Sequence, residues 1–160
     1  MTIRKAEQKD IPRLLDLLSQ VLEVHAQIRP DIFVSGTTKY NEVELKKLLG
    51  QEDYFIYVCT DEIDFVIAYV FCELKHPRHL NFMTPIKTLF IDDLCVDETY
   101  RGQHIGSTLF EFIKCEAKRF GCYEIVLNVW EDNVAAKKFY EAMGFKPKSS
   151  HMEYILGDDN

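Results

Sequence analysis

The sequence predicts an α/β fold (α+β in some classification schemes) in which helices flank a mixed sheet. Two β-branched and aromatic runs follow each other over 53–74, a third apolar run covers 86–96, and helical and strand-like segments then alternate. The 160 residues are 47% hydrophobic and 28% charged, which is ordinary globular composition. We therefore expect one domain over residues 1–160, long enough to bury a core.

The first third of the chain predicts one strand and two helices. Thr2–Ala6 predicts the strand. Asp10 stands where a helix cap is expected, before a helix that runs to about Gln27. The apolar stripe of that helix consists of Ile11, Leu14, Leu15, Leu18, Leu22 and His25. A second helix is predicted over 41–49 and ends at Gly50.

The rest of the chain predicts three strands, then alternating helices and strands. Two strands flank a turn at Asp61-Glu62, and the third covers Ile86–Val96. We expect Ile86–Val129 to form a central β-α-β element. The later elements are a helix over Ile105–Phe120 ended by Gly121, a strand over 122–130, a helix from Asp132 or Asn133 through Met143 followed by Gly144, and a final strand over 151–156.

Charge and hydropathy exclude several classes of function. A net charge of −7 lacks the basic stripe of a nucleic-acid binder. The longest apolar runs are too short to span a bilayer, and the polar N-terminus lacks the apolar core of a signal peptide. Residues 100–148 hold eight Lys/Arg and six Asp/Glu, which leaves −9 on the remainder. We expect no nucleic-acid or membrane partner, and an anionic cofactor at the more basic segment.

Cysteine and histidine usage indicates reduced thiols and no metal site. The five cysteines form an odd set without a CxxC pair, and we expect buried, reduced thiols in a cytoplasmic protein. They are Cys59, Cys72, Cys95, Cys115 and Cys122. His76 and His79 flank a Pro-Arg pair in a loop without a cysteine or acidic partner, so no metal is expected.

The stretch YRGQHIGSTL, Tyr100–Leu109, predicts an anion site. A strand end followed by a turn and a new helix puts several backbone N–H groups, which lack intrahelical partners, at the positive end of the helix dipole. Phosphate is their natural ligand. A plain strand-to-helix turn that needs glycine for its geometry is the alternative. The groups that face the anion in this hypothesis come from Arg101, Gly102, Gly106, Ser107 and Thr108.

A second motif, LNVWEDNVAAKKFYEAMGF, covers Leu127–Phe145. Asn133, Ala136 and Tyr140 are spaced three and four apart, so they share one helix face. That face lies near the carboxyl edge of the sheet, where α/β folds bind ligands. A core tyrosine in an amphipathic helix is the alternative reading of this spacing.

Together the two motifs resemble the GNAT superfamily of N-acetyltransferases. Tyr-Arg-Gly-x-x-Ile-Gly-Ser is similar to its acetyl-CoA pyrophosphate loop, Arg/Gln-x-x-Gly-x-Gly/Ala, and Asn-x-x-Ala-x-x-Phe-Tyr-x-x-x-Gly-Phe to the element that follows. The resemblance covers Ile86–Phe145 in specific residues and most of the chain in element order. It implies a mostly antiparallel sheet of six to seven strands, about four helices, acetyl-CoA as co-substrate, no metal, and direct acetyl transfer to a primary amine.

The resemblance also implies roles for individual residues. The strand end Leu94, Cys95 and Val96 would pair through its backbone with the pantetheine arm, which Asn133 and Ala136 would line. Tyr140 would protonate the departing CoA thiolate, since a phenol can donate a proton at neutral pH. The pyrophosphate would be held by Arg101, Gly102, Gln103, His104, Ile105, Gly106 and Ser107.

His104 departs from the family pattern, because it occupies the position of the first loop glycine. We expect it to adopt a helical backbone conformation, so that the turn survives. CoA binding is then retained in weakened form, and His104→Gly is expected to tighten it.

Asp92 and Asp93 interrupt a predicted central strand. Adjacent strand residues face opposite sides, and an isolated buried carboxylate is costly unless it is paired or hydrated. The stretch FIDDLCVDETYRG is similar to the acidic strand end of diamine acetyltransferases, which implies Asp92 as a base acting through water and Asp93 as the binder of the substrate ammonium. A bulge residue paired with a surface lysine is the alternative, above all for Asp93, and Glu73 and Glu124 are alternative bases.

The expected acceptor is a small cationic amine such as a polyamine or aminoglycoside, with the loop Arg29–Tyr40 shaping its site. A protein or peptide amine is a second hypothesis, and a non-catalytic CoA-binding regulatory protein is a third. His25 is expected in the core and Trp130 in packing. Relatives often pair through their C-terminal strands, so the resemblance also implies a homodimer.

Overall fold

The computed structural model describes residues 1–157, in which one five-stranded sheet forms the centre of the molecule. The strands lie in chain order; the first four are antiparallel neighbours, and the last pair is parallel. They are β1 (Thr2–Lys5), β2 (Tyr54–Thr60), β3 (Val66–Lys75), β4 (Thr88–Val96) and β5 (Glu124–Leu127). The predicted α/β class with a mixed, mostly antiparallel sheet is confirmed. The predicted number of six to seven strands is wrong, since the described residues form five.

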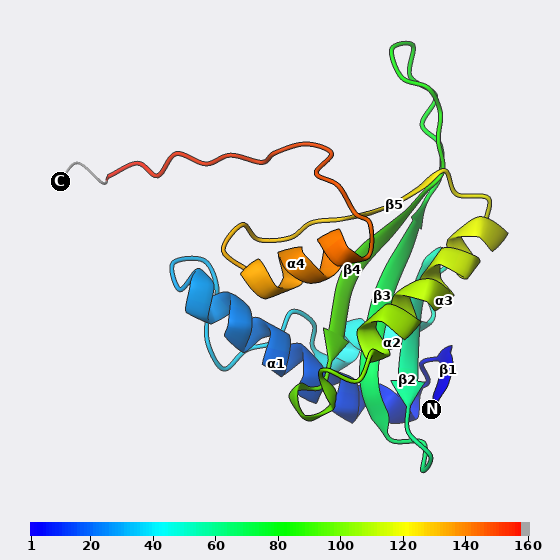
Figure 1. Ribbon diagram of the computed structural model, residues 1–160, viewed down its shortest axis with the longest axis vertical. Coiled ribbons are helices and arrows are strands. Elements are labelled where there is room, and N and C mark those ends of the chain that lie inside the picture. Colours follow the sequence, from blue (N-terminus) through cyan, green and yellow to red (C-terminus); the bar gives the residue numbers. More distant parts are fainter. Residues whose placement is uncertain (158–160) are drawn as a thin grey trace.

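Four helices cover both faces of this sheet, with α3 in front of it and α2 behind it in Figure 1. They are α1 (Ile11–Ile28), α2 (Glu42–Leu49), α3 (Ile105–Arg119) and α4 (Val134–Ala142). Leu109 and Ile113 of α3 belong to the apolar cluster on one face, whereas Leu14 of α1 and Leu45 of α2 belong to the cluster on the other. The result is a three-layer arrangement that gives each sheet face its own core.

Helix ends follow the prediction at two glycines and differ from it at Asp10. Gly121 and Gly144 follow α3 and α4 with φ of +73° and +95°, the left-handed conformation that suits glycine. Asp10 precedes α1, but its side chain does not cap that helix. Its carboxylate instead accepts bonds from Arg4, at 2.7 and 3.0 Å, and from the amide of Glu7. A short 3₁₀ turn before α1 directs the carboxylate back toward β1.

A β-bulge interrupts β4 at Asp92. The consecutive β3 residues Phe71 and Cys72 pair with Asp93 and Ile91, so Asp92 has no partner on β3. An extra residue of this kind breaks the two-residue alternation of side chains. The two carboxylates were expected to face opposite sides of a regular strand, and the bulge makes this expectation wrong.

β4 and β5 separate beyond the bulge. Their parallel pairing ends where Ile91 meets Leu127, although β4 continues to Val96. The chain after β5 swings away from β4 toward α4 (Figure 1). Within the described residues, the outer edge of β4 over 92–96 therefore has unpaired backbone groups next to α3 and α4.

Residues 146–157 form an arm that extends away from the body and contains no strand (Figure 1). The predicted strand over 151–156 is therefore wrong, because no neighbouring strand pairs with this segment. Met152, Tyr154 and Leu156 are each more than 80% exposed along it.

All five cysteines are free, and three of them, Cys59, Cys72 and Cys95, are buried. Cys122 is half-buried, and Cys115 is exposed because it lies on the outer side of α3, so the expectation of burial is wrong for Cys115. In residues 1–157 no helix combines the length and apolar character needed to cross a bilayer.

Candidate active site

The N-terminus of α3 presents free backbone amides beside the end of β4. The first amide of α3 with a backbone acceptor is that of Thr108, which donates to the carbonyl of His104 at 3.0 Å. Among residues 1–157, no group accepts a hydrogen bond from the amides of 102–107. Free amides and the positive end of a helix dipole together favour binding of a phosphate group.

His104 is the residue before α3, with φ of 60° and ψ of 16°. This left-handed conformation corrects the expectation of a helical one. It costs a residue with a Cβ atom about 1–2 kcal/mol, which explains why glycine suits the position. The His104 carbonyl accepts bonds from the hydroxyls of Ser107 and Thr108 at 2.8 and 2.9 Å, so both hydroxyls support the turn. Arg101 is exposed, and its Nε donates to the Val96 carbonyl at 3.3 Å.

Gly106 brings the two sequence motifs together. A Cβ atom at this position would lie 3.1 Å from Cζ of Phe139 on α4 and 3.6 Å from Cγ2 of Val96 on β4. The absence of a side chain therefore lets α3, α4 and the end of β4 meet at one point. The predicted pyrophosphate loop and the predicted pantetheine-lining helix are adjacent in space.

α4 supplies Asn133, Ala136 and Tyr140. The Asn133 side chain caps the helix by accepting a bond from the Ala136 amide at 3.2 Å. Tyr140 is half-buried, and Phe145 packs edge-on against its ring at 5.5 Å. Burial raises the pKa of the Tyr140 phenol, and nearby Asp93 raises it further. The phenol therefore keeps its proton at neutral pH.

Asp92 is enclosed by hydrogen-bond donors. Its carboxylate accepts bonds from the hydroxyls of Tyr40 and Tyr54, at 2.5 and 2.7 Å, and from Lys39 Nζ at 2.9 Å. Burial alone would raise the pKa of Asp92, but these three donors outweigh it and lower the pKa. Asp92 is the bulge residue that pairs with a surface lysine, an arrangement considered above mainly for Asp93.

Asp93 has fewer hydrogen-bond donors than Asp92. Its only hydrogen bond from a side chain in the described chain comes from the hydroxyl of Tyr69 at 3.2 Å. Burial raises the pKa of Asp93 to about 6, while the positive charge of Lys39 opposes this shift. Tyr69 and the Tyr54 that binds Asp92 belong to the same apolar cluster, so the bulge turns both carboxylates toward the α1 and α2 face.

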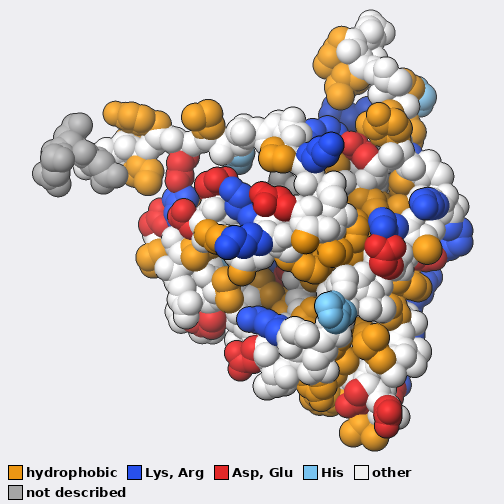
Figure 2. Space-filling model, in the orientation of Figure 1, with side chains coloured by type: hydrophobic (Ala, Val, Ile, Leu, Met, Phe, Trp, Pro, Cys, Tyr) orange, Lys and Arg blue, Asp and Glu red, His pale blue; other side chains and the backbone are white. Residues whose placement is uncertain are grey.

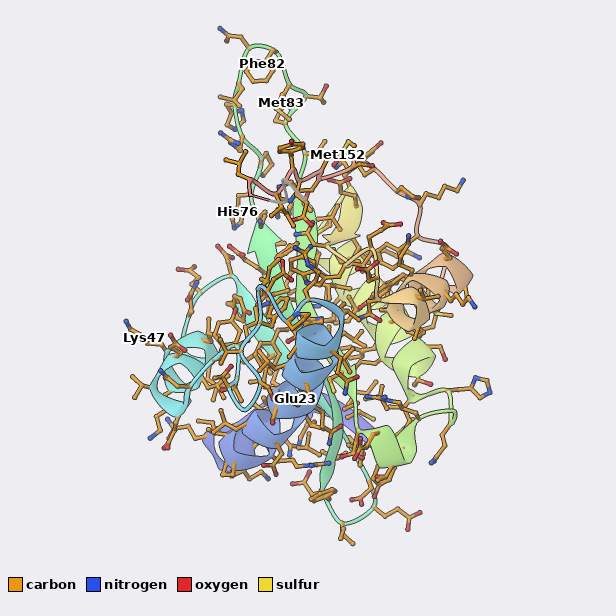
Figure 3. All side chains as sticks on the ribbon, turned by 90° about the vertical axis from the view of Figure 1, so that its left-hand side faces the viewer. Glu23, Lys47, His76, Phe82, Met83 and Met152 are labelled. Atoms are coloured by element: carbon orange, nitrogen blue, oxygen red, sulfur yellow. The ribbon has the colours of Figure 1, made fainter. Side chains whose placement is uncertain are left out.

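The loop between α1 and α2 closes over this acidic pair. Tyr40 stacks on Phe71 of β3 at 5.9 Å, and Glu23 of α1, labelled in Figure 3, accepts bonds from Ser35 and Gly36 at 2.7 Å. Lys39 lies between these two anchors. The loop Arg29–Tyr40 was expected to shape the site, but its Lys39 was not identified from the sequence, nor were Tyr54 and Tyr69, because each reaches Asp92 or Asp93 from a distant segment.

A cluster of three aromatic side chains, Phe33, His25 and Trp130, lies on the α1 side of the site. Phe33 lies 5.0 Å from the His25 ring and 5.2 Å from the Trp130 ring. His25 is half-buried rather than a core residue, and burial lowers its pKa. Trp130 packs as expected, with Arg29 over its ring at 5.8 Å. Figure 2 shows a hollow with apolar side chains on its floor on this face, below the helix that Figure 1 labels α4.

Comparison with known proteins gives this arrangement a family. A family model described as "Acetyltransferase (GNAT) family" matches residues 20–145. The chain belongs to the GNAT acetyltransferases. Members of this family take their acetyl group from acetyl-CoA. The resemblance on Ile86–Phe145 is thereby confirmed at the level of the family.

Individual GNAT relatives differ in the acceptors that their names state. The chain is 31% identical to glucosamine 6-phosphate N-acetyltransferase 1 of Dictyostelium discoideum, over 74% of this chain and 69% of the relative. It is 38% identical to N-alpha-acetyltransferase 30 of Schizosaccharomyces pombe, over 75% and 77%. The structure resembles a crystal structure of a mutant BH1408 protein from Bacillus halodurans, with a TM-score of 0.94 and 35% identity over 98% and 99% of the two chains.

Proposed function

We propose that this GNAT acetyltransferase transfers the acetyl group of acetyl-CoA to the primary amine of a small cationic acceptor. The observation that carries the proposal is the acidic bulge, where Asp92 and Asp93 lie beside the unpaired edge of β4. An ammonium group needs both a carboxylate that binds it and a group that takes its proton before it can attack, since a lysine-like amine has a pKa of about 10.4.

Binding of acetyl-CoA is supported by the free edge and the free amides. The backbone of Leu94, Cys95 and Val96 is available for pairing with the amide groups of a pantetheine arm. The amides of 102–107 suit the diphosphate, and exposed Arg101 adds charge-assisted hydrogen bonds. Asn133 and Ala136 would line the other side of the arm from the start of α4.

The hydrogen bonds of Asp92 and Asp93 support the reverse of the two roles expected from the sequence, in which Asp92 was the base and Asp93 the ammonium binder. Asp92 accepts three strong bonds that keep it ionised, which suits a carboxylate that holds an ammonium group. A pKa of about 6 suits Asp93 as the proton acceptor, because a general base works best near the operating pH. We therefore propose Asp93 as the base and Asp92 as the ammonium binder.

Tyr140 is proposed as the general acid. Its raised pKa keeps the proton on the phenol, and the negative charge of Asp93 contributes to that rise after burial. As the C–S bond breaks, the Tyr140 hydroxyl would donate a proton to the sulfur, while Asp93 removes the proton lost by the amine. Acid and base would thus act on the two ends of the same displacement.

A peptide N-terminal amine is the second candidate acceptor, favoured by the similarity to N-alpha-acetyltransferase 30. The relative named for glucosamine 6-phosphate favours a small amine instead. A free-thiol assay of acetyl-CoA turnover with polyamines, amino sugars, aminoglycosides and short peptides tests both candidates. We expect the highest kcat/KM with a small amine, and loss of most turnover in Tyr140→Phe with acetyl-CoA affinity intact.

The outcome of this panel also tests the class of function. Turnover with peptides alone would contradict a small acceptor. Tight CoA binding without thiol release for any amine would favour the non-catalytic regulatory alternative and contradict catalysis.

We also propose that residues 1–160 act as one domain of a cytoplasmic homodimer. The exposed apolar side chains of the arm support association. Within residues 1–157 the outer edge of β5 has no partner strand, and a cavity of about 340 Å³, lined in part by Ile125 and Met143, opens beside it, so a second copy could dock there. Free thiols support the compartment. Light scattering on Tyr154→Asp, compared with the natural chain, tests the dimer, and an unchanged mass would contradict the role of the arm.

A further inference from the structure

The amine of Lys39 lies within the acidic site itself. Lys39 Nζ is 2.9 Å from Oδ1 of Asp92 and 3.1 Å from its backbone carbonyl. It also interacts electrostatically with Asp93. Lys39 therefore occupies the position that the proposed function gives to the ammonium group of an acceptor.

The surrounding loop holds Lys39 there. The next residue, Tyr40, is fixed by its bond to Asp92 and its stacking on Phe71. On the other side, the hydroxyl of Thr38 donates to the Tyr40 carbonyl at 2.7 Å. The Lys39 side chain is 43% exposed, so its flexible stem can still move while its backbone stays in place.

The amine of Lys39 also lies close to the edge of β4 that is proposed to pair with the pantetheine arm, because it contacts the Asp92 carbonyl at the start of that edge. Asp92 begins this free edge and Leu94 lies two residues further along it, a distance of about 7 Å in a strand. A lysine side chain covers that range by rotation of its stem alone. A tethered amine of this kind reacts faster than the same group free in solution.

We propose that Lys39 is a self-acetylation site, modified in cis by bound acetyl-CoA when no acceptor is present. The inference rests on the proposed function. Nζ loses a proton to Asp93 and attacks the carbonyl carbon of the thioester; a C–N bond forms and the C–S bond breaks. Tyr140 gives its proton to the sulfur and regains one from the attacking nitrogen, so one proton is released to water and acetyl-lysine and CoA are the products.

Acetylation would change the site in a defined way. The neutral amide can no longer form the ion pair with Asp92, so the carboxylate becomes available to an external ammonium group. The positive charge of Lys39 lowers the pKa of Asp93, so loss of that charge lets the pKa of Asp93 rise further. The modified enzyme therefore differs from the unmodified one in acceptor binding and in pH dependence.

The test is incubation of the full chain with acetyl-CoA alone, followed by intact mass measurement and peptide mapping. We expect one acetyl group on Lys39, gained at least about tenfold faster than on Lys47, an exposed lysine on α2 that Figure 3 labels at the periphery. Lys39→Arg should lose this modification. In a mixture of natural chain and Tyr140→Phe chain, only the natural chain should be modified rapidly.

Equal rates at Lys39 and Lys47, or equal modification of both chains in the mixture, would overturn the proposal. The same preparation is then assayed with the amine panel. Turnover of external amines without modification of Lys39 would overturn self-acetylation and leave the proposed function standing. Absence of both would reject the two proposals together.

Discussion

The ring of Phe139 on α4 packs against Gly106 on α3, at a separation that would crowd even a Cβ atom. This contact joins the helix that presents the free amides to the helix that carries Tyr140. The relative position of the two halves of the proposed acetyl-CoA site therefore depends on a residue without a Cβ atom.

Gly106→Val is expected to separate the two helices. A Cβ atom would come 3.1 Å from Cζ of Phe139, so the ring must move, and the branched side chain enlarges that displacement. We expect a loss of about 2 kcal/mol in the free energy of unfolding, measured by urea denaturation, together with weaker acetyl-CoA binding by calorimetry. Gly106→Ala is the matched control with a smaller effect. Equal stability of Gly106→Val and the natural chain would show that the ring is not held there.

His104→Gly should stabilise the turn before α3. Glycine removes the cost of the left-handed conformation, about 1–2 kcal/mol, and loses roughly 0.5–1 kcal/mol through its more flexible unfolded state. The expected net gain is about 0.5 kcal/mol, with tighter acetyl-CoA binding because the turn is preorganised. His104→Val should change both quantities in the opposite direction. Calorimetry that finds unchanged or weaker binding in His104→Gly would refute this account.

Substitution of Asp92 and substitution of Asp93 should affect the pH dependence of kcat/KM differently. With Asp93 as base, kcat/KM falls below about pH 6 as its carboxylate becomes protonated, and Asp93→Asn abolishes that limb with most of the turnover. Asp92→Asn should chiefly raise the KM of the amine. If Asp92→Asn removes the limb and Asp93→Asn leaves it, the sequence-based assignment of Asp92 as the base is the correct one.

Asp93 should also affect stability. Its pKa is raised on folding to about 6, so protonation favours the folded state, and stability falls as pH rises from about 4 to 6. Asp93→Asn should therefore be more stable than the natural chain at pH 8, by up to about 3 kcal/mol, and close to it at pH 4. A destabilised Asp93→Asn at pH 8 would show that the carboxylate supports the fold rather than straining it.

Asp97 should show the opposite pH dependence. This buried carboxylate, after the end of β4, accepts bonds from Arg13, from Gln20 and from the amide and hydroxyl of Thr99. Burial alone would raise the pKa of Asp97, but these donors lower it below its usual value, so its contribution to stability is present above about pH 4 and lost as pH falls. Asp97→Asn should cost about 3 kcal/mol at pH 7 and less at pH 3, by urea denaturation at both values. An equal cost at both values would rule out the ionised carboxylate as the cause.

Local sequence was sufficient for most elements of the fold. Most of the α1 stripe, the glycines after α3 and α4 and the Asn133 cap were predicted, because each is set by side chains within a few residues of each other. Leu17 is buried in α1 although the predicted stripe did not include it. The prediction failed for the strand over 151–156, since a strand exists only where another strand pairs with it. It failed in the same way at His104, whose conformation is decided by the turn that joins β4 to α3.

By itself, the sequence determined the family, because the two motifs of Ile86–Phe145 are short and local, and each is recognisable without knowing its neighbours. Only the tertiary structure decided how the acidic pair is held. The bulge arises from the register between β3 and β4, and Lys39, Tyr54 and Tyr69 reach the carboxylates from segments 24 to 53 residues away in the chain. Proton affinity depends on such distant contacts and on burial, neither of which is encoded in local spacing.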